Sequence, residues 1–148
     1  MLNPDGVING NYRCSLAGCD LNRRWKHPSQ MLHPTIFHAK KLIKEFARER
    51  PLALYCDLHG HSRRKNTFIY GNVDPNCPEA TRIFPYLLSK IASKHFSYDY
   101  CRFKVQKSKE SASRIALWRD IRIPNIFTME ASFCGPKPMF NEETKIFE

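Results

Sequence analysis

The sequence predicts an α/β fold, because segments with helical periodicity alternate with short apolar runs of strand length. The chain has 148 residues, about one domain's worth on a prior of roughly 100–200 residues per domain. Apolar residues make up 42% of the chain. That is enough material for one hydrophobic core, and it excludes a wholly disordered chain.

The N-terminal half is expected to hold one long loop, one helix and two strands. Residues 1–35 are rich in Asn, Gly and Pro and predict a loop, apart from a short apolar piece at Val7-Ile8. Apolar positions recur with a helical period over residues 35–49, and Pro51 ends that helix. Residues 51–58 predict a strand, buried on both faces if the sheet is parallel. Residues 66–70 predict a second, shorter strand.

The C-terminal half is expected to add two helices and a strand. One helix is predicted to begin near Pro85, since proline is tolerated in the first turn. A second, short helix is predicted over residues 112–120. Residues 126–133 predict a strand with Glu130 inside it.

Charge and cysteine content narrow the function classes. Lys and Arg number 24 against 14 acidic residues, a net charge of +10, which favours an acidic partner: nucleic acid, anionic lipid or an acidic polypeptide. No zinc-finger spacing supports specific nucleic-acid binding. No apolar stretch approaches the roughly 18 residues of a membrane helix, and the N-terminus has no signal-peptide pattern. The six cysteines form no Cys-x-x-Cys pair, which favours free thiols and a cytoplasmic location.

The first candidate functional residues are polar side chains that lie in or directly after two predicted strands. Asp57-Leu58-His59-Gly60-His61-Ser62 comes at the end of an apolar strand, where ligands bind in α/β sheets. A histidine there could bind a metal while Asp57 orients its ring, or it could be structural. Glu130 interrupts an apolar strand and could be a general base, or a glutamate that faces outward.

A third candidate lies in the long loop, as Asp20-Leu21-Asn22-Arg23-Arg24-Trp25. Arginine binds carboxylates with two parallel hydrogen bonds, and asparagine adds a neutral donor. The segment could therefore clamp the end of a peptide. A surface loop with two arginines and a packed tryptophan is the alternative.

These segments, taken in order, resemble the zinc metallocarboxypeptidases, and specifically the cytosolic carboxypeptidase branch that shortens polyglutamate on tubulin. The similarity covers about residues 3–135, and the order and spacing of its motifs are specific. The matching motifs are Asn3-Pro4-Asp5-Gly6-Val7, Gly10-Asn11-Tyr12-Arg13, Gly18 to Trp25, Asp57 to Ser62, Phe68-Ile69-Tyr70-Gly71, Phe103 to Glu110 and Phe127-Thr128-Met129-Glu130.

The resemblance implies a role for six residues. His59 resembles a zinc ligand, and Glu130 resembles the catalytic general base. Arg13 resembles the arginine that polarises the scissile carbonyl. Asn22 and Arg23 resemble the pair that binds the substrate's terminal carboxylate, and Arg114 falls near the position that lines the side-chain pocket, where a cation favours a terminal glutamate.

The chain also departs from the family pattern. The His-x-x-Glu motif, which supplies the other two zinc ligands and precedes Asn-Pro-Asp-Gly in relatives, is absent. Relatives carry Glu-Gly-Thr-Gly-Arg where this chain reads Glu110-Ser111-Ala112-Ser113-Arg114. We therefore expect residues 1–148 to be one partial catalytic domain, the C-terminal part of a metallocarboxypeptidase-type α/β/α domain with a mixed central sheet.

Two functions follow from the resemblance. The first is a zinc carboxypeptidase that removes C-terminal glutamate from acidic polypeptides such as tubulin tails, with the isolated chain inactive and holding zinc weakly or not at all. The second is a non-catalytic module that binds acidic C-terminal tails. Neither involves a membrane or a specific nucleic acid.

Overall fold

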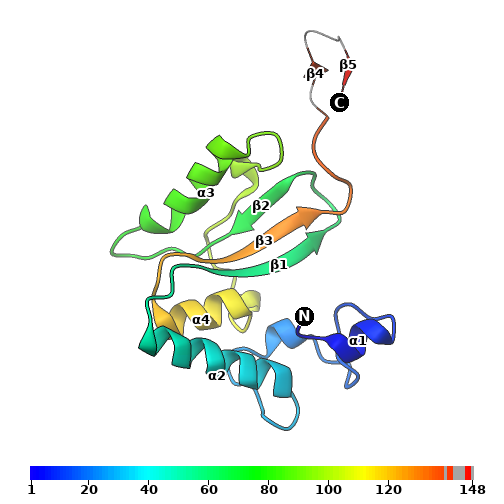
Figure 1. Cartoon of the computed structure of the whole chain (residues 1–148), viewed down its shortest axis with the longest axis vertical. Coiled ribbons are helices and arrows are strands. Elements are labelled where there is room, and N and C mark those ends of the chain that lie inside the picture. Colours follow the sequence, from blue (N-terminus) through cyan, green and yellow to red (C-terminus); the bar gives the residue numbers. More distant parts are fainter. Residues whose placement is uncertain (139, 142–145, 148) are drawn as a thin grey trace. The chain divides into compact units, whose positions relative to one another are not determined.

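The computed structural model describes residues 1–138, 140–141 and 146–147. The chain forms two compact units. Unit 1 comprises Met1–Leu54 and Val105–Ile123, and unit 2 comprises Tyr55–Lys104 and Pro124–Glu148. Figure 1 shows their helices and strands. Within the described part of the chain, no helix is long and apolar enough to cross a membrane.

Unit 1 begins with a short helix where the sequence predicts a loop. Helix α1 covers Pro4–Ile8. The side chain of Asn3 accepts a hydrogen bond from the backbone of Gly6, and Pro4 takes the first helical position. A capping asparagine followed by proline is a favourable helix start, so turn-forming residues here begin a helix instead.

Helix α2 confirms the predicted periodicity. It spans Pro34–Glu49, and Arg50 is extended before Pro51, as expected of a residue that precedes proline. Lys40 in this helix is well buried and donates hydrogen bonds to the carbonyl oxygens of Trp25 and Lys26. Its Nζ also lies 3.1 Å from the carboxylate of Asp120 in helix α4, which spans Ser113–Ile121. Lys40 thus joins α2, α4 and the preceding loop.

The rest of unit 1 is loop with two single-turn 3-10 helices. Helix η1 covers Leu21–Arg23 and helix η3 covers Lys107–Lys109. The backbone N–H of Trp25 donates to the carbonyl of Ser111, 3.1 Å away, which joins the two chain segments of the unit. Trp25 is 2% exposed, so it belongs to the core of this unit.

Unit 2 contains the mixed sheet that the resemblance implies. Strands β1 (Tyr55–His61), β2 (Thr67–Tyr70) and β3 (Ile126–Ser132) have the order β1-β3-β2. Strand β1 is parallel to β3, and β2 is antiparallel to it. A separate antiparallel pair is formed by β4 (Phe140–Asn141) and β5 (Ile146–Phe147).

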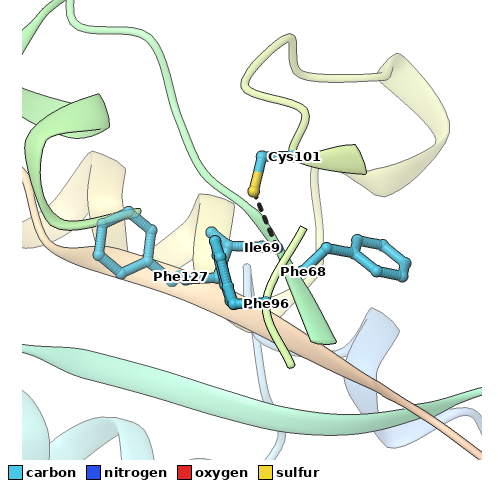
Figure 2. Close-up of a cluster of buried hydrophobic side chains, with 5 residues drawn as sticks. All are labelled: Phe68, Ile69, Phe96, Cys101 and Phe127. Atoms are coloured by element: carbon cyan, nitrogen blue, oxygen red, sulfur yellow. Dashed lines mark hydrogen bonds between the residues drawn. The ribbon is translucent and has the colours of Figure 1, made fainter. Parts of the chain in front are cut away.

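The hydrophobic core of unit 2 lies between the sheet and residues from Phe84 to Phe103. Figure 2 shows five of its buried side chains, Phe68, Ile69, Phe96, Cys101 and Phe127. The backbone N–H of Ile69 donates to the Cys101 sulfur at 3.3 Å. Burial raises the pKa of the Cys101 thiol to about 11, so this cysteine acts as a small core residue rather than a reactive thiol.

Helix α3 corrects the predicted helix start. It spans Ala80–Ile91, so Pro85 lies inside it and not in its first turn. An internal proline removes one backbone hydrogen bond. Burial compensates for this loss, because Phe84 stacks on Phe127 at 5.5 Å between ring centroids and Leu88 packs against the same core. The 3-10 helix η2 (Tyr98–Tyr100) follows.

Strand β1 also differs from its prediction. It begins at Tyr55 rather than at residue 51, and Leu58 is 75% exposed, so the strand is not buried on both faces. The reason lies in the alternation of side chains along a strand. Asp57, His59 and His61 lie on the partly buried face of β1, and Leu58 and Gly60 lie on the opposite face, which is exposed. The predicted strands at 66–70 and 126–133 and the helix at 112–120 are confirmed within a residue.

Candidate functional site

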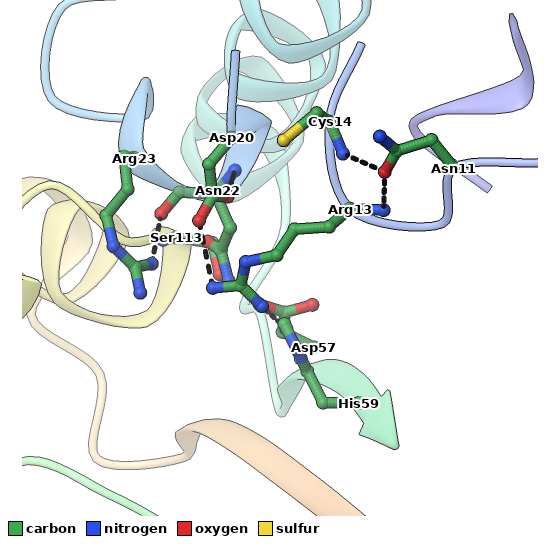
Figure 3. Close-up of polar contacts among 9 residues, drawn as sticks. All are labelled: Asn11, Arg13, Cys14, Asp20, Asn22, Arg23, Asp57, His59 and Ser113. Atoms are coloured by element: carbon green, nitrogen blue, oxygen red, sulfur yellow. Dashed lines mark hydrogen bonds and ion pairs between the residues drawn. The ribbon is translucent and has the colours of Figure 1, made fainter. Parts of the chain in front are cut away.

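In unit 1, Asn22 connects the long loop to the start of α4. Its side-chain Oδ1 accepts a hydrogen bond of 2.9 Å from the backbone N–H of Ser113, 91 positions away in the sequence. Ala112, at the cap position of α4, has no side-chain oxygen to offer. Asn22 therefore satisfies a helix N–H group that local sequence leaves without a partner, and this bond fixes the orientation of its amide (Figure 3).

Asp20 organises the same loop through both of its carboxylate oxygens. Oδ1 accepts from the backbone N–H of Asn22 at 3.0 Å, and Oδ2 lies 2.9 Å from Nη2 of Arg13. The sequence prediction did not single out Asp20. Its position two residues before Asn22, as the cap of η1, was the available signal.

Hydrogen bonds fix the backbone at Arg13, while its guanidinium remains accessible. Asn11 Oδ1 accepts from the backbone N–H groups of Arg13 and Cys14, at 3.0 and 2.9 Å. The Arg13 side chain is 51% exposed. A guanidinium carries five N–H donors, so the ion pair with Asp20 leaves it able to bind a further oxygen.

Two further arginines accompany this cluster in unit 1. Arg23 is half-buried and donates from Nη1 to the carbonyl of Asn22 at 2.9 Å. Arg114 is 7% exposed and lies in the first turn of α4. A buried cation is costly unless a negative group faces it, and helix N-termini also attract anions. Arg13, Asn22 and Arg23 are at least partly exposed and form the cationic surface of unit 1, whereas Arg114 is buried in the same unit.

In unit 2, His59 has the environment of an oriented imidazole. Its Nε2 lies 2.9 Å from Oδ2 of Asp57, two residues earlier on the same face of β1. The contact agrees with the interpretation that Asp57 orients a ring. A carboxylate bonded to one ring nitrogen fixes the tautomer and orientation of the ring, as is usual for histidines that bind metals.

Glu130 lies beside His59 in the sheet. The parallel register of β1 and β3 pairs His59 with Glu130, so the two side chains project from the same face. The Glu130 side chain is 14% exposed, and its Oε2 lies 3.7 Å from Nδ1 of His61. His61 packs edge-on against Phe68 at 5.0 Å. Glu130 therefore faces inward toward histidines rather than outward.

The described residues form only part of a site for the metal that the resemblance implies. Within residues 1–138, 140–141 and 146–147, no three His, Cys, Asp or Glu side chains are grouped so that they could hold a metal ion. His59 with Asp57 fits one ligand and its orienting partner. Catalytic zinc sites use three protein ligands, so the described residues do not fit a complete zinc site.

The structure thus divides the predicted residues between the two units. Arg13, Asn22, Arg23 and Arg114 lie in unit 1, and His59 and Glu130 lie in unit 2. Asp20 links Arg13 to Asn22, Asn22 contacts Arg23 and Ser113, and His59 pairs with Glu130.

Comparison with known proteins identifies the relatives. The chain is 48% identical over 151 aligned residues to human cytosolic carboxypeptidase 1, which covers 91% of this chain and 12% of that protein. It is 52% identical over 137 aligned residues to mouse cytosolic carboxypeptidase 2, covering 91% of this chain and 16% of the relative. The chain therefore spans less than a fifth of the length of these relatives. No protein-family model matches it.

Solved structures show the same class of fold. A metallo-carboxypeptidase from Burkholderia cenocepacia superposes with a TM-score of 0.74 at 21% identity, over 89% of this chain and 34% of that one. A metallo-carboxypeptidase from Pseudomonas aeruginosa, solved in complex with (2-guanidinoethylmercapto)succinic acid, gives 0.72 at 26% identity, over 89% and 35%. The fold is thus that of the metallocarboxypeptidases. Within that class, the chain is similar in sequence to one segment of the cytosolic carboxypeptidases.

Proposed function

We propose that this chain supplies the substrate-binding and proton-transfer residues of a metallocarboxypeptidase that removes C-terminal glutamate from acidic polypeptides. The observation that carries the proposal is the pairing of His59 and Glu130 on adjacent parallel strands, in a chain about half identical to cytosolic carboxypeptidases. The names of these relatives also support a cytosolic location for this protein.

The cationic surface of unit 1 is suited to the substrate's C-terminal end. In this proposal the Asn22 amide and the Arg23 guanidinium bind the terminal carboxylate, since an arginine fork matches its two oxygens. Arg13 donates to the oxygen of the scissile carbonyl as negative charge develops on it. Asp20 positions both groups, because it binds the Arg13 guanidinium and the Asn22 backbone at once.

Glu130 is proposed as the general base and acid. It takes a proton from the water that attacks the scissile carbonyl carbon, and it delivers a proton to the amine nitrogen as the C–N bond breaks. A bound zinc ion would polarise the carbonyl and acidify the water. His59 would be one of its ligands, with the remaining ligands outside the described residues.

Arg114 is proposed to select the terminal side chain. A glutamate side chain needs a second positive group besides the one that binds the main-chain carboxylate. Arg114 is buried in the first turn of α4 in the same unit as Asn22 and Arg23. Acidic polypeptide C-termini, such as those of tubulin, are therefore the proposed substrates.

The test is release of C-terminal glutamate by the natural full-length protein supplied with zinc. Glu130→Gln keeps the shape of the side chain but cannot accept a proton. We expect kcat to fall by about 10²–10⁴-fold, with the substrate dissociation constant nearly unchanged. Glu79→Gln, at an exposed glutamate that precedes α3, is the matched control and should behave as wild type. Near-normal kcat in Glu130→Gln would exclude this residue from proton transfer.

A second candidate is a module that binds acidic C-termini without cutting them. It is favoured by one observation: the described residues include no group of three His, Cys, Asp or Glu side chains that could hold a metal ion. The two functions separate in the same experiment. A protein that binds peptides ending in free glutamate but releases no amino acid, even with zinc, would be the binding module.

A further inference from the structure

Unit 2 contains an open cleft that the roles proposed above do not use. Its volume is about 510 Å³, in the range of about 300–1,000 Å³ typical of ligand sites. We call it the lysine cleft and define it by six of its lining residues: Tyr86, Lys90, Lys94, Tyr98, Asp99 and Lys137. The first three come from α3 and the turn after it, the next two from η2, and Lys137 from the segment that follows β3.

The three lysines of this cleft keep their positive charge available. In the part of the chain that the structure describes, no carboxylate lies within ion-pair distance of Lys90, Lys94 or Lys137, although other lysines, such as Lys40, have such a partner. Lys90 lies over the Tyr86 ring at 4.9 Å, and Lys137 lies over the Tyr100 ring at 4.4 Å. These rings hold the ammonium groups in place without neutralising them. Asp99 alone supplies negative charge in the lining.

The cleft lies at the same end of the sheet as Glu130 but on the opposite face, because α3 packs on the face of Phe127, and Glu130 follows Phe127 by three residues in β3. Asn66, which also lines the cleft, directly precedes β2, and the first residue of β2, Thr67, pairs with Ala131, which follows Glu130. Asn66 also ties down the lysine-bearing segment, because its Oδ1 accepts from the backbone N–H of Lys137 at 2.6 Å.

The chemistry of the lining favours carboxylates over phosphates or bases. The cleft presents lysines and no arginine, whereas arginine forks are the preferred partners of phosphate. Single-stranded nucleic acids stack their bases on open aromatic faces. Here the Tyr86 ring carries Lys90 and also packs edge-on against Tyr98 at 5.8 Å. Each lysine carries a compact charge on a flexible side chain, so the three lysines can bind separate side-chain carboxylates of one extended peptide.

We propose that the lysine cleft is a docking site for the side-chain carboxylates of a glutamate-rich polypeptide. The assignment of that polypeptide as substrate rests on the proposed function. The docking itself requires neither hydrolysis nor a terminal carboxylate.

The experiment measures binding of a fluorescent hexaglutamate with an amidated C-terminus to the 148-residue chain. Amidation removes the carboxylate that Asn22 and Arg23 are proposed to bind. The test variant replaces Lys90, Lys94 and Lys137 by Gln. The control variant removes the same charge elsewhere, by replacing Lys26, Lys41 and Lys104, which are exposed and do not line the cleft. Circular dichroism checks the folding of each.

We expect the cleft variant to weaken binding by about tenfold, equivalent to about 1.4 kcal/mol, and the control by less than about twofold. Added salt should weaken wild-type binding, because the lysines are exposed. If the triple variant does not fold, Lys94→Gln and Lys137→Gln alone should each cost about twofold. Equal losses in the cleft and control variants would overturn the proposal in favour of diffuse charge, and so would the absence of binding to the wild-type chain.

Two competitors distinguish other occupants. Inorganic phosphate that displaces the peptide as well as free hexaglutamate does would make the cleft a phosphate site. Oligouridine that binds more tightly through the same lysines would make it a nucleic-acid site. Arg23→Leu should leave binding of the amidated peptide unchanged. Binding of the amidated peptide does not require hydrolysis. If the cleft variant binds this peptide normally, the docking proposal is wrong, and the carboxypeptidase proposal is unaffected.

Discussion

Two replacements of Asn22 separate its structural contribution from its proposed contribution to substrate binding. Its Oδ1 accepts the hydrogen bond of Ser113 at the start of α4, while its amide is assigned to the terminal carboxylate of the substrate. Asn22→Ala removes both interactions. Asn22→Asp keeps an oxygen for Ser113 but places a negative charge where a carboxylate should bind.

The structure sets the size of the stability effects. Loss of a helix-capping oxygen costs about 0.5–2 kcal/mol, and the partly buried N–H of Ser113 would lose its partner. We therefore expect Asn22→Ala to lower the free energy of unfolding by about 1–2 kcal/mol, which is about 2–8 °C in Tm for a chain of this size. Asn22→Asp should lose little or gain slightly, because an anion at a helix N-terminus contributes about 0.3–1 kcal/mol.

The assay can follow unit 1 on its own. The chain has two tryptophans, and both Trp25 and Trp118 are buried in this unit. Urea unfolding followed by tryptophan fluorescence therefore reports the stability of the unit that contains Asn22. Binding of a peptide with a free terminal glutamate is measured in parallel, and both variants should lose it, Asn22→Asp by about tenfold or more because like charges meet.

The reasoning would be refuted by one pattern in particular. If Asn22→Asp destabilises unit 1 as much as Asn22→Ala does, the Oδ1 contact does not cap α4. If Asn22→Asp retains normal peptide binding, the Asn22 side chain does not contact the terminal carboxylate.

Two further predictions concern specificity and pH. In the natural full-length protein, Arg114→Leu should lower kcat/KM for terminal glutamate by about 10²-fold and spare terminal leucine, because breaking a buried charge pair costs about 2–5 kcal/mol. Arg23→Leu should impair all substrates alike, and equal losses on peptides ending in Glu, Gln and Leu would make Arg114 structural. Because burial raises the pKa of Cys101 from 9.0 to about 11, the folded protein holds a proton that the unfolded chain releases. Stability should therefore fall as pH rises from about 9 toward 11. Urea midpoints across this range should show a smaller decline in Cys101→Ala than in wild type, and an unchanged decline would contradict the assignment.

The periodicity of apolar residues predicted those elements whose buried positions follow the local sequence pattern. Helix α2, helix α4 and strand β3 lie within about a residue of their predicted ranges. The error at α3 arises because distant packing outweighs a local signal. Stacking of Phe84 on Phe127 allows α3 to continue through Pro85, and no local pattern contains that contact.

The same distinction explains which parts of the candidate site were predictable. Alternation along a strand already places Asp57 and His59 on one face, so their contact could be expected from two positions in the sequence. Assignment of Glu130 beside His59 needed the family resemblance, because the register of β1 on β3 depends on how the two strands meet.

The hydrogen bond from Ser113 to Asn22 joins residues 91 positions apart, and neither residue type predicts it. Its consequence is physical. The loop that carries the proposed carboxylate-binding residues is joined to the start of the helix that carries Arg114 by this bond and by the one from Trp25 to Ser111. The proposed binding of the terminal carboxylate and the proposed selection of the terminal side chain are therefore coupled. A substitution that loosens the start of α4 should therefore weaken peptide binding even where it removes no group that touches the substrate.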